Sequence, residues 1–227
     1  MSDTALGTGT DTLVIGVDEA GRGPLAGPVC AGAVILGPDY GRIGLADSKS
    51  ISEKKRERLA PEIQSTSLAW GLGWASVDEI DTHDILRATF IAMARAVESC
   101  LQMLDLRQEG KVVAQLLVQV DGNRSPGDFK GPWTWPYATE TIVKGDQKIP
   151  AISAASILAK TARDREMHRL HEQYPVYGFA QHAGYGTAVH LQALKTHGVS
   201  PVHRKTFAPV ARCLDRDRHT THADQDH

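Results

Sequence analysis

The apolar residues form short runs in the first half of the chain and longer helical patterns in the second half. Residues 13–17 form an apolar, β-branched run, and apolar positions alternate within 28–36, so both segments predict strands. A Gly/Pro turn separates the two segments, which allows them to pair in antiparallel fashion. Three further strands are predicted at 68–75, 112–120 and 139–143.

Apolar residues return at helical spacing between residues 83 and 105, which predicts an amphipathic helix. Ser52 is a suitable N-cap for a helix over 52–64, and Pro61 should end or kink that helix. The other expected helices are 152–173, 188–197 with Gly198 as its C-terminal cap, and 201–214.

The order of these elements predicts one α/β domain. Strands gather early in the chain and helices late, which favours a mixed sheet packed by helices on one or both faces. The length of 227 residues fits a single domain, which we expect to span residues 12–214. Residues 1–11 and 215–227 are polar, and we expect a disordered N-terminus and a disordered tail.

Composition indicates a cytoplasmic protein. The three cysteines are far apart and fit no zinc or CxxC spacing, so free thiols in a reducing compartment are expected. The chain has no apolar stretch of the length that a membrane span needs, and residues 1–10 lack the basic start of a secretory signal. We expect no membrane association, and nothing in the sequence requires more than a monomer.

The net charge of −2 conceals a gradient along the chain. Residues 144–212 contain ten Lys or Arg against four Asp or Glu, together with six of the ten histidines. This distribution allows one part of the molecule to bind a polyanion while another part concentrates carboxylates. On charge alone, ordinary solvated helices are the better interpretation.

Carboxylates recur at the ends of predicted strands. Asp18 and Glu19 follow the first strand, Asp121 follows the strand 112–120, and Asp146 comes shortly after the last strand. If these strands are neighbours, their acids can converge into a set of hard oxygen ligands that suits Mg²⁺ or Mn²⁺. With phosphate oxygens as further ligands, such a set is typical of two-metal phosphoryl chemistry.

Structural alternatives exist for these acids. Asp121 and Asp146 adjoin glycines, as turn residues often do. Asp164 competes as the fourth carboxylate, although it lies in a predicted helix between Arg163 and Arg165, where an ion pair is the simpler account. Spacing alone leaves the choice between Asp146 and Asp164 open.

Residues 21–26 satisfy the glycine pattern of a dinucleotide-binding turn, but its context is wrong. Prolines interrupt the turn, and a strand follows it where a helix would be needed, so no NAD site is expected. What remains is Gly21-Arg22-Gly23, in which glycines allow close backbone approach and Arg22 offers a bidentate donor for phosphate. A tight turn with an exposed arginine is an equally good interpretation.

Tyr185 lies between two glycines just before a predicted helix. Its ring could stack on a sugar or a base, whereas a core tyrosine with a bonded hydroxyl is the more ordinary interpretation. His182 and His203 fit no metal pattern, and we expect them at the surface or facing phosphate.

Taken together, these residues resemble the motifs of the bacterial ribonuclease HII family. The resemblance covers residues 13–212, and its six blocks occur in the family's order. The blocks are Val14 to Val29 (with Asp18-Glu19-Ala20-Gly21-Arg22-Gly23), Asp47-Ser48-Lys49, Val120-Asp121-Gly122-Asn123, Lys144-Gly145-Asp146, Ile152 to Lys160 followed by Arg163-Asp164, and Tyr177-Gly178-Phe179 with His182, Gly184-Tyr185 and Thr187.

The resemblance implies a ribonuclease H-like fold, in which helices flank a mixed central sheet and a C-terminal helical part helps hold a duplex. It implies a metal-dependent endonuclease that cleaves the RNA of RNA–DNA hybrids and nicks duplex DNA 5′ of embedded ribonucleotides. The implied products carry 5′-phosphate and 3′-hydroxyl ends. The implied roles are hybrid removal and ribonucleotide excision repair.

The resemblance also implies residue roles. Asp18, Glu19, Asp121 and Asp146 match the family's four catalytic, metal-binding acids, which favours Asp146 over Asp164. Two Mg²⁺ or Mn²⁺ ions are implied when substrate is bound.

Substrate contacts are implied at three places. Gly21-Arg22-Gly23 matches the segment that reads the 2′-hydroxyl at the RNA-to-DNA junction, and Tyr185 matches the residue that stacks on the next sugar. Lys49 is a matching phosphate contact.

Three departures from the family pattern stand out. Ala183 and Ser50 replace frequent lysines, so a phosphate contact could be missing and the affinity for a polyanion lower. The loop with Trp133 and Trp135 looks longer than usual, and we expect a neutral surface insertion, with an added stacking platform as the alternative.

Two other functions fit the same residues. One is a different metal-dependent nuclease or strand-transfer enzyme on this fold, which would cut DNA without needing a ribose. The other is a non-catalytic duplex-binding protein, which would bind without metal-dependent cleavage.

Overall fold

A five-stranded mixed sheet forms the centre of the molecule in a computed structural model, which describes residues 12–42, 44, 51–108 and 115–223. The strands lie in the order β3-β2-β1-β4-β5. β1 pairs antiparallel with β2 and parallel with β4, which confirms the predicted antiparallel pair and the mixed sheet. The strands are β1 (Thr12–Ala20), β2 (Val29–Ile35), β3 (Ala69–Ala75), β4 (Gln115–Asp121) and β5 (Ala138–Ile142).

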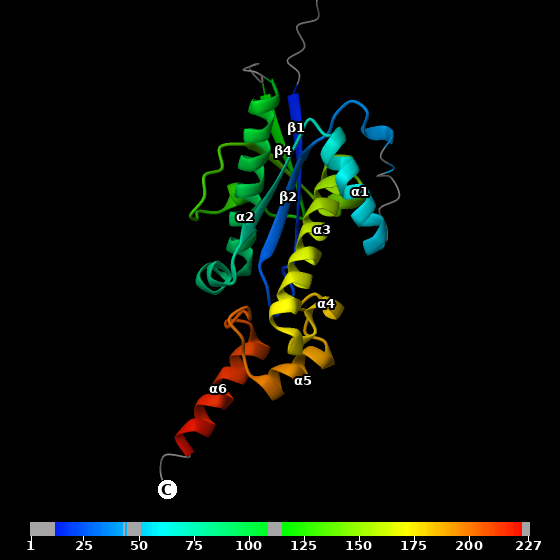
Figure 1. The fold of residues 1–227 in the computed structure, drawn as a ribbon. Coiled ribbons are helices and arrows are strands. Elements are labelled where there is room, and N and C mark those ends of the chain that lie inside the picture. The colour runs from blue at the N-terminus through cyan, green and yellow to red at the C-terminus, as the bar shows by residue number, and fades with distance from the viewer. Residues whose placement is uncertain (1–11, 43, 45–50, 109–114, 224–227) are drawn as a thin grey trace, which may run out of the picture.

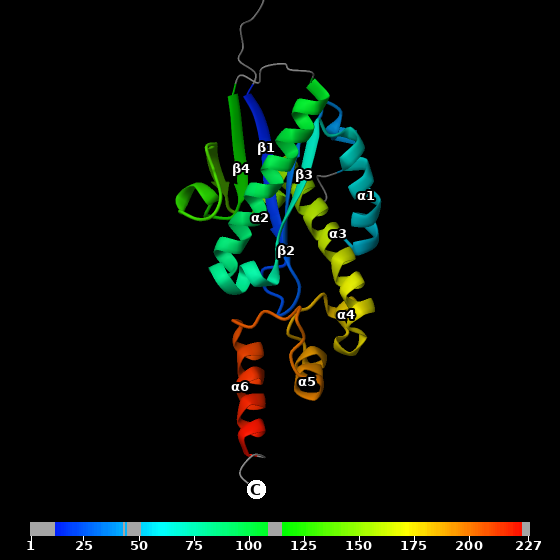
Figure 2. The ribbon, with the colours of Figure 1, turned by 60° about the vertical axis from the view of Figure 1, so that its left-hand side comes forward.

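Helices cover both faces of this sheet, as Figures 1 and 2 show. α2 packs on one face, and α3 with α1 packs on the other. Three further helices follow beyond one end of the sheet and form the expected C-terminal helical part. The helices are α1 (Glu53–Thr66), α2 (Val77–Gln108), α3 (Pro150–Gln173), α4 (Phe179–His182), α5 (Ala188–His197) and α6 (Ala208–Ala223).

Each face of the sheet has its own apolar core. Ile15 and Val17 of β1 are fully buried against α2, beside Met93 and Val97. On the opposite face, Val34 of β2 joins a cluster formed by α1 and α3. Burial on both faces removes apolar surface from water along the full length of β2, whose seven residues are all buried.

Glycines in the sheet bring α3 unusually close to β1 and β2. A Cβ at Gly32 would lie 2.5 Å from the carbonyl oxygen of Ala155, and one at Gly16 would collide with the backbone of Ala151. Only glycine therefore permits this approach. It places the small-residue face of α3 against the end of β1, where the first two candidate acids lie.

Several element boundaries differ from the sequence predictions. β1 continues through Ala20, so Asp18 and Glu19 lie within the strand, not after it. Pro61 does not end α1, because the helix continues to Thr66 and buries Ile63 against α3. α2 begins at Val77, before the predicted start, but it is bent at Asp84, whose backbone angles are not helical (φ 68°, ψ 164°). The part of α2 beyond this bend begins close to the predicted residue 83.

α6 begins at Ala208 and runs to Ala223, past residue 214, where we expected the domain to end and a tail to begin. The predicted strand residues 112–114 and the predicted disordered segment 1–11 lie outside the described residues.

The loop with two tryptophans packs onto α2. The Trp133 ring lies edge-on to Phe90 of α2, with ring centroids 5.8 Å apart. Its indole N–H donates to the carbonyl of Pro126 at 3.1 Å, and the Trp135 indole N–H donates to the Thr139 hydroxyl at 2.8 Å. Both indoles are half-buried and hydrogen bonded, an arrangement that fits a folded surface insertion better than a free stacking platform.

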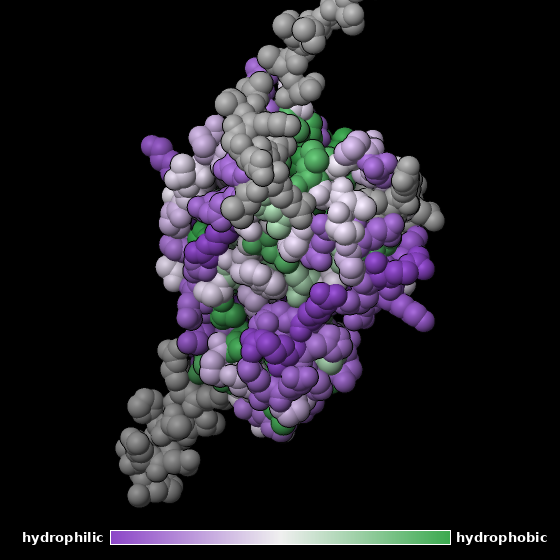
Figure 3. All heavy atoms as spheres, turned by 45° about the horizontal axis from the view of Figure 1, so that its top comes forward, coloured by the Kyte–Doolittle hydropathy of each residue, from purple (hydrophilic) through white to green (hydrophobic). Residues whose placement is uncertain are grey.

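Polar residues dominate the face shown in Figure 3, where apolar side chains occur in small separate groups. Among the described residues, none of the helices combines the length and the apolar character that a bilayer span requires.

Candidate active site

The ends of β1 and β4 bring candidate acids together. The two strands are parallel neighbours, and Val17 lies opposite Val120, so Asp18 and Asp121 follow at the same level. Asp121 accepts a 2.6 Å hydrogen bond from the backbone N–H of Gly145, which fixes the short turn that contains Asp146. All four acids therefore lie at one end of the sheet, as expected if these strands were neighbours.

Burial dominates the electrostatics of Asp18. The residue is only 6% exposed, and burial, together with the charges of Glu19 and Asp121, raises the pKa of Asp18 to about 8. A hydrogen bond from Ser156 on α3 and one from the Glu19 backbone N–H, at 2.7 Å, oppose this rise only in part. The carboxylate form of Asp18 is thus costly unless a cation joins it.

Burial also raises the pKa of Glu19, although Arg22 works against it. The Arg22 guanidinium donates to Glu19 at 3.1 Å and is itself about half exposed. The charge of Asp121 adds to the rise, which shows that the acids of the two strands act on one another.

The donor set fits a hard divalent cation by its chemistry. Its members are carboxylate oxygens, and the raised pKa of Asp18 marks a cost that bound Mg²⁺ or Mn²⁺ would remove. Among the described residues, no three acidic, histidine or cysteine side chains are already arranged to hold an ion. Closing such a site requires the acids to turn toward a bound cation.

Asp164 lines a pocket together with Glu19, but its carboxylate is engaged by an arginine of another helix. Its carboxylate pairs at 2.7 Å with Arg56 of α1. Arg165 pairs with Glu57, whereas Arg163 donates to backbone carbonyls. The ion pair expected for Asp164 exists, but its partner comes from another helix.

Gly21-Arg22-Gly23 and Tyr185 line one pocket of about 360 Å³, and Glu19 lines it too. Gly21 has φ +99°, and a Cβ there would collide with the Arg163 side chain, so the position requires glycine. A Cβ on Gly23 would lie 3.2 Å from Cε1 of Tyr185. The Tyr185 ring is 50% exposed, so it is not the core tyrosine of the alternative interpretation.

Cationic residues that the sequence reasoning did not select line the same pocket. Arg56 comes from α1, and Lys160 is an exposed residue of α3. Ala183 lines it as well, at the position where a lysine is frequent in the family. Lys49 and Ser50 lie outside the described residues, so the phosphate contact of Lys49 stays a prediction.

His203 was expected at the surface or facing phosphate, and that prediction is wrong. His203 is fully buried, and Arg204 beside it is fully buried as well. His182 is half-buried and bonds the carbonyl of Tyr177 at 2.7 Å. The sequence offered no signal for this burial, because the partners of these residues lie far away in the chain.

The chain matches known proteins over nearly its whole length. A family model described as Ribonuclease HII matches residues 15–210. A ribonuclease HII of Ralstonia nicotianae is 53% identical over 93% of this chain and 83% of its own length. A ribonuclease HII of Burkholderia lata is 54% identical over 90% of this chain and 87% of its own.

Solved structures show the same fold. Ribonuclease H2 from Pyrococcus horikoshii superposes with a TM-score of 0.65 at 26% identity, over 90% of this chain and 98% of that one. Bst-RNase HIII in complex with Mn²⁺ superposes with a TM-score of 0.69 at 16% identity, over 92% and 71%. The implied ribonuclease H-like fold is therefore confirmed. The extent and identity of these matches show that the chain belongs to the ribonuclease HII family and is a ribonuclease of that class.

Proposed function

We propose that this ribonuclease cleaves the RNA strand of RNA–DNA hybrids and nicks duplex DNA 5′ of an embedded ribonucleotide. The products would carry 5′-phosphate and 3′-hydroxyl ends. One observation carries the proposal: Glu19 of the acid group lines the same pocket as Gly21-Arg22-Gly23 and Tyr185. A ribose held by that segment lies beside the acids that would serve the scissile phosphate.

Asp18, Glu19, Asp121 and Asp146 would hold Mg²⁺ or Mn²⁺, and Mn²⁺ is the ion bound in the Bst-RNase HIII structure. The bound metal would supply an activated water and stabilise the leaving 3′ oxygen. The four acids would position this chemistry. Asp18 must lose its proton on binding, because the buried acid has a raised pKa before a cation arrives.

The remaining residues would select the substrate. Gly21 and Gly23 let the backbone approach the ribose closely, and Arg22 can exchange its contact with Glu19 for a phosphate oxygen. Tyr185, exposed over the pocket, can stack on the following sugar. Reading a 2′-hydroxyl in this way distinguishes RNA from DNA.

We further propose that the protein works as a monomer in the cytoplasm, in hybrid removal and ribonucleotide excision repair. Its net positive segment, residues 144–212, contributes α3 and Tyr185 to the pocket and so faces the polyanion there.

The test is cleavage of an end-labelled DNA duplex that contains one ribonucleotide, with and without Mg²⁺ or Mn²⁺. An all-DNA duplex of the same sequence, a long hybrid and an Asp121→Asn variant serve as controls. We expect a metal-dependent cut 5′ of the ribonucleotide, absent from the all-DNA duplex. Equal cutting of the all-DNA duplex would favour a nuclease that does not read ribose, and binding without any cutting would favour a duplex-binding protein.

A further inference from the structure

The side chain of Arg204 hydrogen-bonds the backbone of the loop that contains Gly21-Arg22-Gly23. This side chain is fully buried and donates hydrogen bonds to four backbone carbonyls of residues 21–28. Nη2 donates to the carbonyls of Gly21 at 2.6 Å and Pro28 at 3.3 Å, and Nη1 donates to that of Arg22 at 2.9 Å. Nε donates to the carbonyl of Gly27 at 2.9 Å. A planar guanidinium satisfied in this way dictates where those carbonyls lie.

The backbone around Arg204 pairs with the same loop. The N–H of Arg204 donates to the carbonyl of Leu25 at 2.9 Å, and the N–H of Gly27 donates to that of Val202 at 2.8 Å. Ala26 and His203 form an isolated antiparallel bridge between these bonds. Residues 202–204 therefore act as a short strand that fixes the loop by main chain and side chain together.

A chain of hydrogen bonds links His203 to the backbone of Tyr185. The Ser200 N–H donates to Nδ1 of His203 at 3.1 Å, which leaves the proton of a neutral ring on Nε2. That proton points at Nε2 of His190, 3.0 Å away, and Nδ1 of His190 then donates to the carbonyl of Tyr185 at 2.9 Å. One set of neutral tautomers satisfies every bond in this chain.

The two supported parts meet in the pocket. Gly23 and the ring of Tyr185 are neighbours, because a Cβ on Gly23 would lie 3.2 Å from Cε1 of that ring. The Leu25 N–H also donates to the carbonyl of Gly184 at 2.8 Å. The neighbouring residues His203 and Arg204 thus hold the two sides of the candidate ribose site, one side each.

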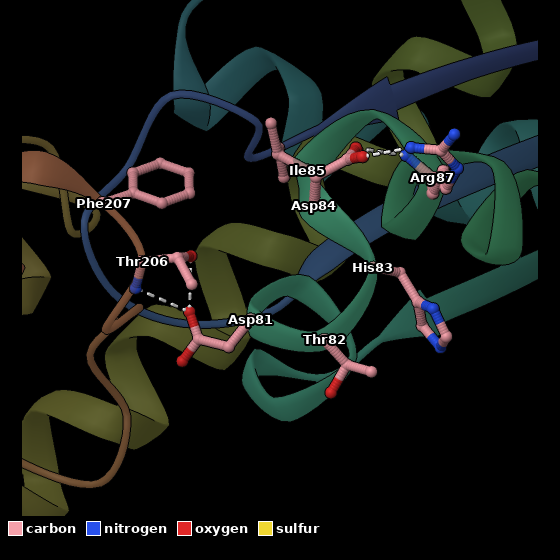
Figure 4. A pocket seen from close by; sticks show the side chains of 8 residues that line it. All are labelled: Asp81, Thr82, His83, Asp84, Ile85, Arg87, Thr206 and Phe207. Atoms are coloured by element: carbon pink, nitrogen blue, oxygen red, sulfur yellow. Dashed lines mark hydrogen bonds and ion pairs between the residues drawn. The ribbon is translucent and has the colours of Figure 1, made fainter.

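A carboxylate at the bend of α2 anchors the far end of this segment. Asp81 accepts from the backbone N–H groups of Lys205 and Thr206, both at 3.0 Å, and from the Thr206 hydroxyl at 2.7 Å. Figure 4 shows Asp81 and Thr206 side by side and joined by hydrogen bonds, in the lining of a pocket of about 670 Å³. The Arg204 guanidinium lies over the ring of Phe207, 5.1 Å from its centroid.

We infer that Arg204 is a positioning residue for ribose recognition, and that it acts by fixing the backbone of Gly21-Arg22-Gly23 against Tyr185. The inference rests on the proposed function, because it assigns a role toward the ribose that this site would read. Arg204 is buried and would act on the substrate only through this loop. Its loss should therefore reduce selectivity for a ribonucleotide junction more than it reduces cleavage in general.

The experiment compares Arg204→Lys with Val210→Ala. Lysine keeps the charge but loses the fork that reaches several carbonyls. Val210 is fully buried in the same C-terminal cluster and contributes apolar packing, so its truncation is a matched loss of stability. For each variant, kcat/KM is measured on a duplex with one ribonucleotide and on a long hybrid, below its Tm.

We expect Arg204→Lys to lower the ratio of these two kcat/KM values about tenfold, because a small displacement of a positioned group is costly. Val210→Ala should leave the ratio within about twofold while it lowers the Tm. In an Arg22→Ala background, Arg204→Lys should change the ratio much less, because the two residues act through one loop. Equal ratios in Arg204→Lys and Val210→Ala would overturn the inference.

Asp81→Ala keeps the inference testable if Arg204→Lys fails to fold. It removes a partly exposed anchor and leaves Arg204 in place, so a smaller fall in the same ratio is expected, about threefold. An unchanged ratio in Asp81→Ala would overturn the inference in that case. If the wild-type protein shows no preference for the ribonucleotide duplex over all-DNA, the proposed function itself fails, which the wild-type measurement reveals separately.

Discussion

The acid group and the Arg204 segment both bury charge, but they compensate it differently. At the acid group, burial and the charges of neighbouring carboxylates raise the pKa values of Asp18 and Glu19, and the nearby cation, Arg22, is half exposed. At the Arg204 segment, a buried guanidinium meets four carbonyl acceptors. The acid group lacks the positive charge that a metal ion would bring, whereas the buried guanidinium of Arg204 already has its hydrogen-bond acceptors without any ligand.

On the proposed function, this difference falls between the group that would carry out cleavage and the loop that would recognise the ribose. A carboxylate group with uncompensated charge binds cations strongly, because the cation removes a cost that the fold has already incurred. A loop whose carbonyls are held by a buried guanidinium keeps its geometry before substrate arrives, which lowers the ordering cost of binding. The molecule thus places a ligand-dependent region beside a pre-organised one, with the pocket of Glu19 and Tyr185 between them.

Removing one acid should have the largest effect. Asp121→Asn should lower kcat at least about a thousandfold, roughly 4 kcal/mol of transition-state stabilisation, because a metal ligand is lost. Binding to hybrid should stay measurable, since the positioned loop is unchanged. The comparison uses Asp105→Asn, an exposed change on α2, as the control. Cleavage by Asp121→Asn near the wild-type rate would refute the role of the acid group.

Acid should weaken the region around Arg204. Burial, with a smaller contribution from His190, lowers the pKa of His203 to about 4, below its ordinary value of 6.5. Between these values the unfolded chain binds the proton more readily, so the free energy of unfolding falls as pH drops from about 6.5 to about 4. The loss attributable to His203 should be on the order of 2 kcal/mol.

Urea unfolding at a series of pH values measures this loss. His203→Gln should flatten the acid limb of the profile, whereas His168→Gln, an exposed change on α3, should leave it as in the wild type. If the free energy of unfolding of His203→Gln fell with acid as it does in the wild type, the buried His190–His203 pair would not be the group that acid disrupts.

Removing the stacking ring should affect activity and spare stability. Tyr185→Ala should lower kcat/KM on a ribonucleotide duplex about tenfold to a hundredfold, since stacking contributes roughly 1–3 kcal/mol. Its Tm should change little because the ring is half exposed. Tyr40→Ala, another exposed tyrosine, is the control for both measurements. Losses of Tm and activity in equal measure would make Tyr185 a packing residue.

A smaller effect on activity than at Tyr185 is expected at Arg22, at the boundary of the two regions. Arg22→Ala should reduce the ratio of ribonucleotide to all-DNA cleavage about fivefold, the value of one exposed hydrogen bond of roughly 1 kcal/mol. Arg87→Ala removes a similarly exposed arginine at the bend of α2 and should leave the ratio unchanged. An unchanged ratio in Arg22→Ala would assign discrimination to the loop backbone and Tyr185.

Local patterns in the sequence predicted most of the fold, because strand alternation and helical spacing depend on neighbouring residues. The five strands and the helices α2, α3 and α5 follow these patterns. Ser52 caps α1 as predicted, by accepting from the N–H of Lys55. Pro61 does not end α1, since the packing of α1 against α3 outweighs a local preference for termination.

Tertiary partners could not be predicted in the same way. The acids at strand ends were recognisable, yet only the family resemblance favoured Asp146 over Asp164, and the Arg56 partner of Asp164 became visible only in the structure. Arg204 and His203 gave no periodic signal. Their roles depend on carbonyls and a ring nitrogen contributed by distant segments, which no local pattern encodes.

The Arg204 bonds also set an order of events during synthesis. Arg204 lies 177 residues beyond Gly27, whose carbonyl it binds, so a growing chain contains all four acids long before it contains this support. If the pocket reads ribose as proposed, the ribosome must release the last helices before that site can take its final shape. An incomplete chain would then hold the acids proposed for cleavage before it holds the support for ribose selectivity.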